Sequence, residues 1–256
     1  MKDVHRKIGI MGAMKEEVAD VIELLSNPTE TITGQRSYIS GEINGISTVV
    51  VFSRWGKVAA AATVSALIHE FGITELIFTG VAGGINPDLK IGDIVLGERL
   101  VQHDMDPRPM YQQFEIPLLH KIFIEADKNH IKTAENAICR FLKPDNFYAV
   151  FSSEIIQKFN LSNPQLHKGD IASGDVFFSK REQKEILHSQ LPSVLCVEME
   201  GAAVAQVCYE YKIPCTIIRT ISDTADEKSH VDFPSFIKHV SSIYSLQIIQ
   251  NMYASL

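Results

Sequence analysis

The sequence predicts a single α/β domain with a central mixed, largely parallel β-sheet flanked by helices. Short apolar runs typical of strands alternate along the chain with segments of helical periodicity. The strand runs are almost continuously apolar, as expected of strands that are covered on both faces. The 256 residues contain no repeat, low-complexity tract or obvious linker, and they suffice for one large core. We therefore expect residues 1–256 to form one domain.

The first half of the chain alternates between strand and helix patterns. Residues 7–12, KIGIMG, are an apolar run ending in glycine, and residues 14–25 place apolar side chains at helical spacing. Asn44 and Gly45 separate two alternating runs, which predicts a hairpin turn. The alanine-rich segment 57–72 favours a helix. Further strands are predicted at 75–80 and 93–104.

The second half continues the alternation with one interruption. Residues 117–143 are predicted to be mostly helical, whereas 143–166 fits poorly and is expected to be a surface excursion or part of a pocket rim. Ser179 is a plausible N-cap for a helix over 179–191. The remaining predictions are strands at 193–199 and 214–222 and helices at 201–212 and 234–253.

The composition excludes several functional classes. The net charge is -7 without a cluster of Lys and Arg, which disfavours nucleic-acid binding. The apolar run near the N-terminus is too short for a signal peptide or membrane span. The four cysteines lack the spacing of a metal site, and three of them lie in apolar runs. We therefore expect a reduced, cytoplasmic protein with no membrane partner, metal or cofactor.

Carboxylates gather at the predicted strand ends, where α/β folds place their sites. They are Glu17, Asp175, Glu198, Glu200 and Asp223. Each also has a structural interpretation: Glu17 suits the first turn of a helix, Asp223 a helix cap, and the other two glutamates a salt bridge at a strand end. If 194–200 were one strand, Glu198 and Glu200 would share a face; a strand that breaks at Met199 would separate them.

Other motifs are individually weak. The segment TGVAGG at 79–84 could cradle a phosphate, but it lacks a nucleotide-binding pattern, so a tight turn is favoured. One His and two Asp at 102–106 are more typical of a solvated strand end than of a metal site. Phe177 and Phe178 suit either the core or stacking on a planar heterocycle. Carboxylates without a metal or nucleophile favour acid/base work on a polar substrate, such as glycosyl transfer.

Six motifs stand in order along nearly the whole chain: IGIMGAMKEEV (8–18), TGVAGG (79–84), LKIGDIV (89–95), ASGDVF (172–177), VEMEGAAVA (197–205) and RTISDTAD (219–226). Together they resemble the 5′-methylthioadenosine/S-adenosylhomocysteine nucleosidases of the nucleoside phosphorylase superfamily. This resemblance implies hydrolysis of the bond between adenine and ribose.

The resemblance implies two catalytic acids. Glu17 matches the group that activates the attacking water, and Asp223 matches the acid that protonates or hydrogen-bonds N7 of the leaving adenine. Cleavage produces an oxocarbenium-like ribosyl cation, which nearby carboxylates stabilise. On this interpretation Asp223 must carry a proton and Glu17 must stay ionised, and no metal is needed.

The resemblance also implies a set of substrate contacts. Glu200 matches the carboxylate that holds the ribose 2′- and 3′-hydroxyls, with the backbone of Met199 beside it. Phe177 matches a ring stacked on adenine, and the backbone of Phe178 matches the group that reads its edge. Ser222 matches the residue that places Asp223.

The sequence departs from the family pattern in three places, one of which is the segment 143–166, longer here than is usual in the family. Val81 stands where many members carry Ser, so a contact from that side chain to the substrate is lost. The loop 103–117 also differs, and in the family it reaches the neighbouring subunit's pocket for the 5′-substituent. Met110, Phe114 and Pro117 are the candidates for that apolar wall. The resemblance therefore also implies a homodimer.

Two alternative activities remain open. A 6-amino-6-deoxyfutalosine nucleosidase would use the same carboxylates with a wider 5′ pocket. A purine nucleoside phosphorylase would need cations around phosphate, and only Arg54 suggests one. We therefore expect a small nucleoside as substrate and water as co-substrate.

Overall fold

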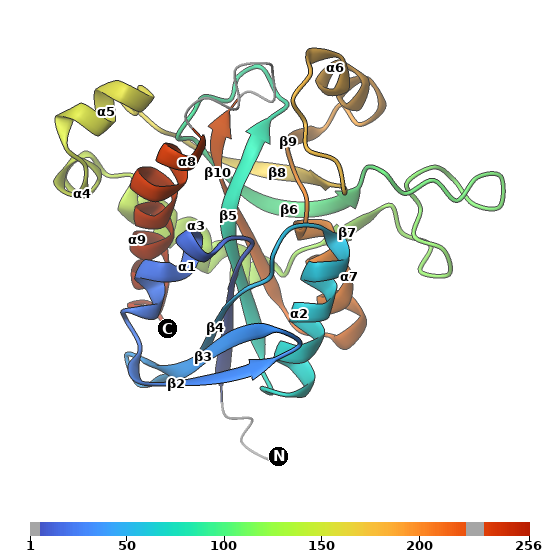
Figure 1. Cartoon of the computed structure of the whole chain (residues 1–256). Helices are drawn as coiled ribbons and strands as arrows, with labels where there is room; N and C mark the ends of the chain where they lie inside the picture. Colours follow the sequence, from blue (N-terminus) through green and yellow to red (C-terminus); the bar gives the residue numbers. More distant parts are fainter. Residues whose placement is uncertain (1–5, 224–232) are drawn as a thin grey trace.

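A computed structural model describes residues 6–223 and 233–256, and shows one mixed β-sheet flanked by helices (Figure 1). The last three residues of RTISDTAD, 224–226, lie outside the described residues. The strands are β1 (Lys7–Gly12), β2 (Ser26–Thr33), β3 (Arg36–Ile43), β4 (Ile46–Phe52), β5 (Glu75–Gly84), β6 (Ile94–Gln102), β7 (Phe123–Glu125), β8 (Leu166–Ser173), β9 (Val194–Glu198) and β10 (Cys215–Asp223).

The helices fall into two layers. Helices α1 and α3 both contact α9 on one side of the sheet, and α2 contacts α7 on the other (Figure 1). No helix within the described residues is long and apolar enough to cross a membrane. The helices are α1 (Lys15–Ile22), α2 (Lys57–His69), α3 (Lys128–Phe141), α4 (Pro144–Val150), α5 (Ser153–Phe159), α6 (Arg181–Gln190), α7 (Gly201–Tyr211), α8 (Phe233–Phe236), the π-helical turn η1 (Ile237–Ser241) and α9 (Ser242–Tyr253).

Strand β5 organises the sheet. Parallel pairings join it to β1 and β10, and β1 is followed outward by β4, β3 and β2. On the other side β10, β6, β8 and β9 return to β5 and close a ring. The closing pair is antiparallel and joins only Gly83 to Val197 and Gly84 to Cys196. The carboxyl ends of β5 and β9 therefore meet, although the two strands run in opposite directions.

The predicted two-sided burial of the strands is confirmed. Ile77 and Ile218 belong to the core under α1, α3 and α9. Their neighbours Phe78 and Ile217 belong to the core under α2 and α7. Adjacent side chains of a strand point to opposite faces, so continuous apolar runs are what two covered faces require.

The predicted hairpin is also confirmed. Strands β3 and β4 pair antiparallel, and the turn consists of Asn44 and Gly45 at φ 52° and 78°. Both residues adopt the left-handed region, which Asn and Gly tolerate best.

The prediction that 117–143 is mostly helical is wrong for its first third. Residues Phe123–Glu125 form β7, which pairs antiparallel with β6. Helix α3 begins only after Asp127, whose carboxylate caps it by accepting the N–H of Asn129 at 2.9 Å and of His130 at 3.0 Å. The short strand lacks the length that a sequence pattern needs to distinguish it from a helix.

Two local predictions need correction. Residues 79–84 are not a tight turn, because β5 continues to Gly84 and pairs with both β10 and β9 there. Ser179 is not the N-cap of α6; Lys180 occupies that position. The Gln183 side chain accepts the N–H of Ser179 and of Lys180, each at 3.1 Å. A residue inside the first turn thus provides the acceptor for backbone N–H groups at the start of the helix.

The segment 143–166 contains α4 and α5. It is anchored by aromatic side chains, since Phe147, Phe151 and Phe159 are buried in the core that also holds α3 and α9. Helix α5 starts at a Ser152 cap and ends at Asn160 in the left-handed conformation.

Candidate active site

One cavity lies where the carboxyl ends of β1, β5, β9 and β10 come together. Its empty volume, with the open mouth included, is about 600 Å³. This is the position that an open α/β sheet favours for a ligand. The predicted site residues among its lining are Glu17, Val81, Phe177, Phe178, Met199, Glu200, Ser222 and Asp223.

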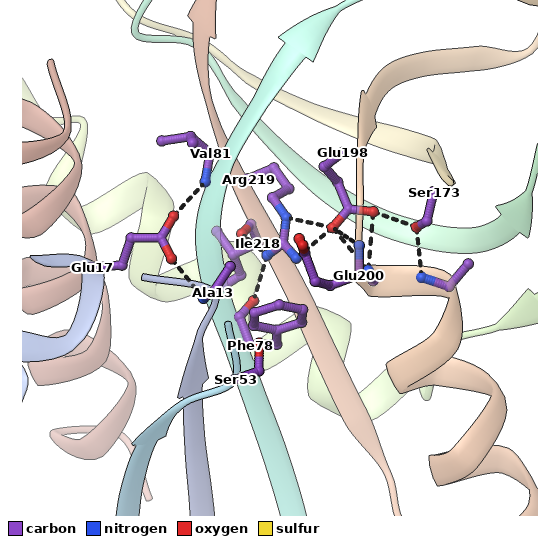
Figure 2. Close-up of polar contacts among 12 residues, drawn as sticks. Ala13, Glu17, Ser53, Phe78, Val81, Ser173, Glu198, Glu200, Ile218 and Arg219 are labelled. Carbon is purple, nitrogen blue, oxygen red and sulfur yellow. Dashed lines mark hydrogen bonds and ion pairs between the residues drawn. The ribbon is translucent and has the colours of Figure 1, made fainter. Parts of the chain in front are cut away.

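Glu17 lies in the first turn of α1 and is only 1% exposed. Its Oε2 accepts the N–H of Ala13 at 2.7 Å, and its Oε1 accepts the N–H of Val81 at 3.3 Å (Figure 2). The Oε2 atom also accepts the N–H of Met14 at 2.9 Å. A Cβ atom at Gly80 would lie 2.9 Å from that Oε1, so a side chain there would force the carboxylate to shift. The Gly-rich end of β5 therefore packs against the carboxylate of Glu17 and gives it one N–H donor.

The electrostatics of Glu17 combine opposing influences. Burial raises the pKa of Glu17, while the backbone N–H donors and the charge of Arg219 act to lower it. A carboxyl group with a raised pKa is a stronger base once it is ionised, and the N–H donors favour the ionised form. The position therefore suits a proton acceptor that faces a cavity.

Asp223 ends β10 and also lines the cavity. The residue is buried, and its Oδ2 accepts a hydrogen bond from Ser222 Oγ at 2.7 Å. Ser222 Oγ also lies 3.4 Å from the carbonyl of Ala82 on β5. The hydroxyl therefore holds the Oδ2 atom of Asp223.

Glu198 and Glu200 are separated because β9 ends at Glu198 and α7 begins at Gly201. The Glu198 carboxylate forms a buried ion pair with Arg219, with Nη2 at 2.7 Å and Nε at 3.2 Å from Oε2 (Figure 2). It also accepts a short hydrogen bond from Ser173 Oγ and the N–H of Gly201 at 2.8 Å. Glu198 is therefore the acid of a buried structural pair.

Arg219 anchors this pair from β10. Its guanidinium carbon lies 4.0 Å from the centroid of the Phe78 ring, and its Nη1 donates to the carbonyls of Phe78 and Ile218 at 3.2 and 2.9 Å. Removing one partner of such a pair leaves an uncompensated buried charge. The charge of Arg219 is thus balanced by Glu198.

Glu200 points the other way, toward the start of α2. Its Oε1 accepts the N–H of Gly56 at 2.7 Å. Burial, followed by the nearby negative charge of Glu198, raises the pKa of Glu200 to about 8. Such a carboxyl group, held by one N–H and facing a cavity, can accept further hydrogen bonds from a ligand.

The aromatic wall of the cavity comes from the segment after β8 and from α8. The ring of Phe177 contacts Phe233 edge-on at a centroid distance of 6.4 Å, and Phe178 contacts His103 edge-on at 5.2 Å. Phe177 is 39% exposed and lines the cavity, and an aromatic ring at such a position can stack on a planar ligand.

Three predicted residues do not line this cavity. Met110 is 84% exposed on the loop between β6 and β7, which extends away from the body of the molecule (Figure 1). Pro117, on the same loop, is half-buried. Phe114 is buried in a core cluster of its own chain with Ile85 and Val101. We therefore keep only Met110 and Pro117 as candidates for a wall that faces a neighbour.

Sequence reasoning missed several residues of the site. Trp55 and Phe233 line the cavity, and Gly56 binds Glu200. Arg219 could have been suspected because it is a lone cation inside the apolar run of β10. Gly56 and Glu200 lie 144 positions apart, and nothing in the local sequence links them.

No described residue that lines the cavity is Lys or Arg. Arg54, the one candidate from the sequence, is exposed and donates a short hydrogen bond to the carbonyl of Gln35. Arg219 is engaged by Glu198. The described part of the cavity thus lacks the cation that a phosphate dianion requires.

Comparisons with known proteins agree with this geometry. The family model of the phosphorylase superfamily matches residues 7–245. A 5′-methylthioadenosine/S-adenosylhomocysteine nucleosidase of Anoxybacillus flavithermus is 34% identical, covering 96% of this chain and 97% of its own. An aminodeoxyfutalosine nucleosidase of Helicobacter pylori is 36% identical, covering 91% of this chain and 92% of its own.

A solved structure shows the same fold. The 5′-methylthioadenosine/S-adenosylhomocysteine nucleosidase of Neisseria meningitidis, in complex with methylthio-immucillin-A, superposes with a TM-score of 0.85. The match covers 98% of this chain and 100% of that chain at 30% identity. Both the family model and the relatives span nearly the whole sequence. The chain therefore belongs to the phosphorylase superfamily, and within it to the nucleosidases that hydrolyse N-ribosyl bonds.

Proposed function

We propose that this protein hydrolyses the N-glycosidic bond of 5′-methylthioadenosine and S-adenosylhomocysteine, giving adenine and a 5′-thio-substituted ribose. The observation that carries the proposal is the convergence of Glu17, Glu200 and Asp223 on one cavity whose described lining contains no cation. The Anoxybacillus and Neisseria relatives are 5′-methylthioadenosine/S-adenosylhomocysteine nucleosidases, which supports the same substrates.

In the proposed reaction Glu17 activates water. Its buried carboxylate faces the cavity, and its raised pKa favours uptake of a proton from an attacking water. The backbone donors of Ala13, Met14 and Val81 hold the carboxylate in place, so its orientation needs no reorganisation when the proton moves.

Asp223 assists departure of adenine in the same scheme. A purine anion is a poor leaving group, so a proton or a strong hydrogen bond at N7 lowers the barrier. Ser222 fixes one oxygen of Asp223 at 2.7 Å, which directs the carboxyl group. Phe177 would stack on the base, since the residue lines the same cavity as Asp223.

Glu200 holds the ribose diol in this proposal, and Met199 lies beside the sugar. The Gly56 N–H donates one hydrogen bond to Oε1 of Glu200. Each carboxylate oxygen can accept more than one hydrogen bond, so the group can also accept bonds from two hydroxyl groups. The negative charge of ionised Glu17 would stabilise the cationic ribosyl group as the bond breaks.

The pKa of Glu200 predicts a stability effect with a definite sign. Its value of about 8 in the folded protein lies above the ordinary 4.5, so between these values the unfolded chain binds fewer protons than the folded one. Stability from this group is therefore lost as the pH rises toward 8. We expect Glu200→Gln to raise the melting temperature more at about pH 8.5 than at about pH 5.

Differential scanning calorimetry at the two pH values checks this expectation. Glu16→Gln is the matched control, because Glu16 is exposed on the same helix as Glu17 and should show the same small effect at both. A gain for Glu200→Gln that does not grow with pH would contradict a buried carboxyl group of raised pKa.

We further propose that the protein works as a homodimer. Val58 at the start of α2 is 81% exposed, and the neighbouring Trp55 and the α7 residue Tyr211 are also exposed apolar side chains. Because α2 packs beside α7, these residues suit a common apolar surface. Met110 and Pro117 would then face the partner's 5′ pocket, and sedimentation at working concentration should show a dimer rather than a monomer.

The cysteines support a cytoplasmic location. All four are free, and Cys196, Cys208 and Cys215 are buried. Buried thiols without a disulfide are typical of proteins in a reducing compartment.

The 36% identity to the Helicobacter pylori protein favours a second candidate substrate, 6-amino-6-deoxyfutalosine. Comparing kcat/KM for this nucleoside, 5′-methylthioadenosine and S-adenosylhomocysteine tests the proposal. We expect the two sulfur nucleosides to be preferred. A kcat/KM highest for the aminodeoxyfutalosine would assign that substrate instead, with the same catalytic groups.

A further inference from the structure

Lys57, the first residue of α2, sits in a network just outside the cavity. Its backbone N–H donates to Asp175 Oδ1 at 2.8 Å, and its ammonium donates to Asp104 Oδ1 at 2.6 Å and to Gln102 Oε1 at 3.0 Å. Asp104 in turn accepts the N–H of Asp175 at 2.9 Å through Oδ2. Lys57 and Asp104 thus form two connections to the same residue, Asp175.

The network joins two parts of the active site that are far apart in sequence. On one side, Gly56 directly precedes Lys57 and donates its N–H to Glu200 at 2.7 Å. On the other side, Asp175 directly precedes the segment that carries Phe177. Lys57 itself does not line the cavity. Its influence on a ligand must therefore pass through the residues that it holds.

The local backbone fits this arrangement. Gly56 has a φ of +93°, and a Cβ added there would lie 3.0 Å from Asp175 Oδ1. Glycine thus permits both the turn into α2 and the close approach of the carboxylate.

The ion pair is partly shielded from water. The side chains of Lys57 and Asp104 are 17% and 25% exposed. Burial alone would raise the pKa of Asp104, but the hydrogen bonds from Lys57 and from the N–H of Asp175 bring it below its usual value. A partly buried pair with two backbone connections holds its geometry better than an exposed pair.

We propose that Lys57 is a positioning residue whose contacts with Asp104 and Asp175 fix the placement of Glu200 relative to Phe177. This inference rests on the proposed function, in which Glu200 binds ribose and Phe177 stacks on adenine. A nucleoside uses both groups at once, whereas adenine alone uses only the aromatic side. Loss of the Lys57 ammonium should therefore lower kcat/KM for the nucleoside more than it weakens the binding of adenine.

Lys57→Met tests this directly, because it removes the charge and keeps the backbone N–H to Asp175. We expect kcat/KM for 5′-methylthioadenosine to fall about 10- to 100-fold, the scale of a small misplacement of binding groups. The dissociation constant of adenine should change by less than about threefold. Trp55 is the only tryptophan in the sequence and lines the cavity, so its fluorescence reports adenine binding.

The control and rescue variants separate positioning from general stability. Lys128→Met makes the same change at the first residue of α3, where the side chain is exposed, and should leave activity unchanged. Lys57→Arg should recover most of the activity because it retains a cation. Asp104→Asn should mimic Lys57→Met, and the double variant should lose little more than either single variant, since both remove one interaction.

Several outcomes would overturn the proposal. Wild-type kcat/KM in Lys57→Met or Asp104→Asn would exclude a positioning role, and so would multiplicative losses in the double variant. Equal weakening of adenine and nucleoside would show that only the aromatic segment is disturbed. If wild-type protein does not cleave 5′-methylthioadenosine, the proposed substrate fails by itself, and the same variants are compared on whichever nucleoside the wild type cleaves.

Discussion

Asp223→Asn is expected to lower the turnover of 5′-methylthioadenosine by about 100- to 10,000-fold, the range associated with loss of a general acid. Asparagine keeps the size of the side chain and an acceptor for Ser222, which contacts Asp223 at 2.7 Å. It cannot deliver a proton to the leaving base. Adenine binding should persist, because Phe177 and the cavity wall remain. Steady-state release of adenine measures the first effect, and Trp55 fluorescence the second.

The nature of the leaving group provides a sharper control. In a 5′-methylthioribosyl nitrophenyl compound the leaving group is nitrophenolate. Nitrophenolate is a stable anion, so its departure needs little protonation. Asp223→Asn should therefore cleave this compound almost as fast as the wild type. The exposed Asp145, at the start of α4, offers a matched Asp145→Asn variant with unchanged turnover. Equal losses on both substrates would contradict the assignment of Asp223 as the acid.

Glu17→Gln is expected to lower turnover by a similar factor, but on both kinds of substrate. The amide cannot accept a proton from water, so the attack on the ribosyl carbon loses its base. Because attack is needed whatever the leaving group, turnover should fall with both adenine and nitrophenolate as leaving groups. Steady-state rates on the two substrates provide the measurement.

The comparison of the two variants assigns the roles. Turnover of the nitrophenolate compound by Glu17→Gln at the wild-type rate would remove Glu17 from the water-activating position. Glu16→Gln changes the adjacent, exposed carboxylate and is expected to be neutral. A loss confined to Glu17 would link the effect to the carboxylate held by Ala13, Met14 and Val81.

Much of the fold was predictable because its strands are covered on both faces. Continuous apolar runs such as those of β5 and β10 identify buried strands without any need for alternation. The β3–β4 turn was predictable from Asn44 and Gly45. Strand β7 was not predictable, because Phe123–Glu125 is a strand only through its pairing with β6. A three-residue segment is too short to show a strand pattern in the sequence.

The acids that face the cavity were predictable for a related reason. Glu17, Glu200 and Asp223 lie at or shortly after the carboxyl ends of apolar strands, where α/β folds place their sites. Their partners were not predictable, because they come from segments far away in sequence. Gly56 reaches Glu200 across 144 positions, and Lys57 reaches Asp175 across 118.

Glu198 shows how the structure resolves an ambiguity of the sequence. Parity along a continuous strand would have turned it toward the same face as Glu200. The strand ends at Glu198, and the carboxylate instead meets Arg219, Ser173 and the first N–H groups of α7. Its charge is therefore balanced within the scaffold, while Glu200 remains available to the cavity.

Adenine release from 5′-methylthioadenosine, measured with and without inorganic phosphate, shows whether water or phosphate is the nucleophile at a cavity whose described lining contains no Lys or Arg. We predict the same rate in both and free 5-methylthioribose as the sugar product. Release that requires phosphate and yields the sugar 1-phosphate would show that the enzyme is a phosphorylase instead.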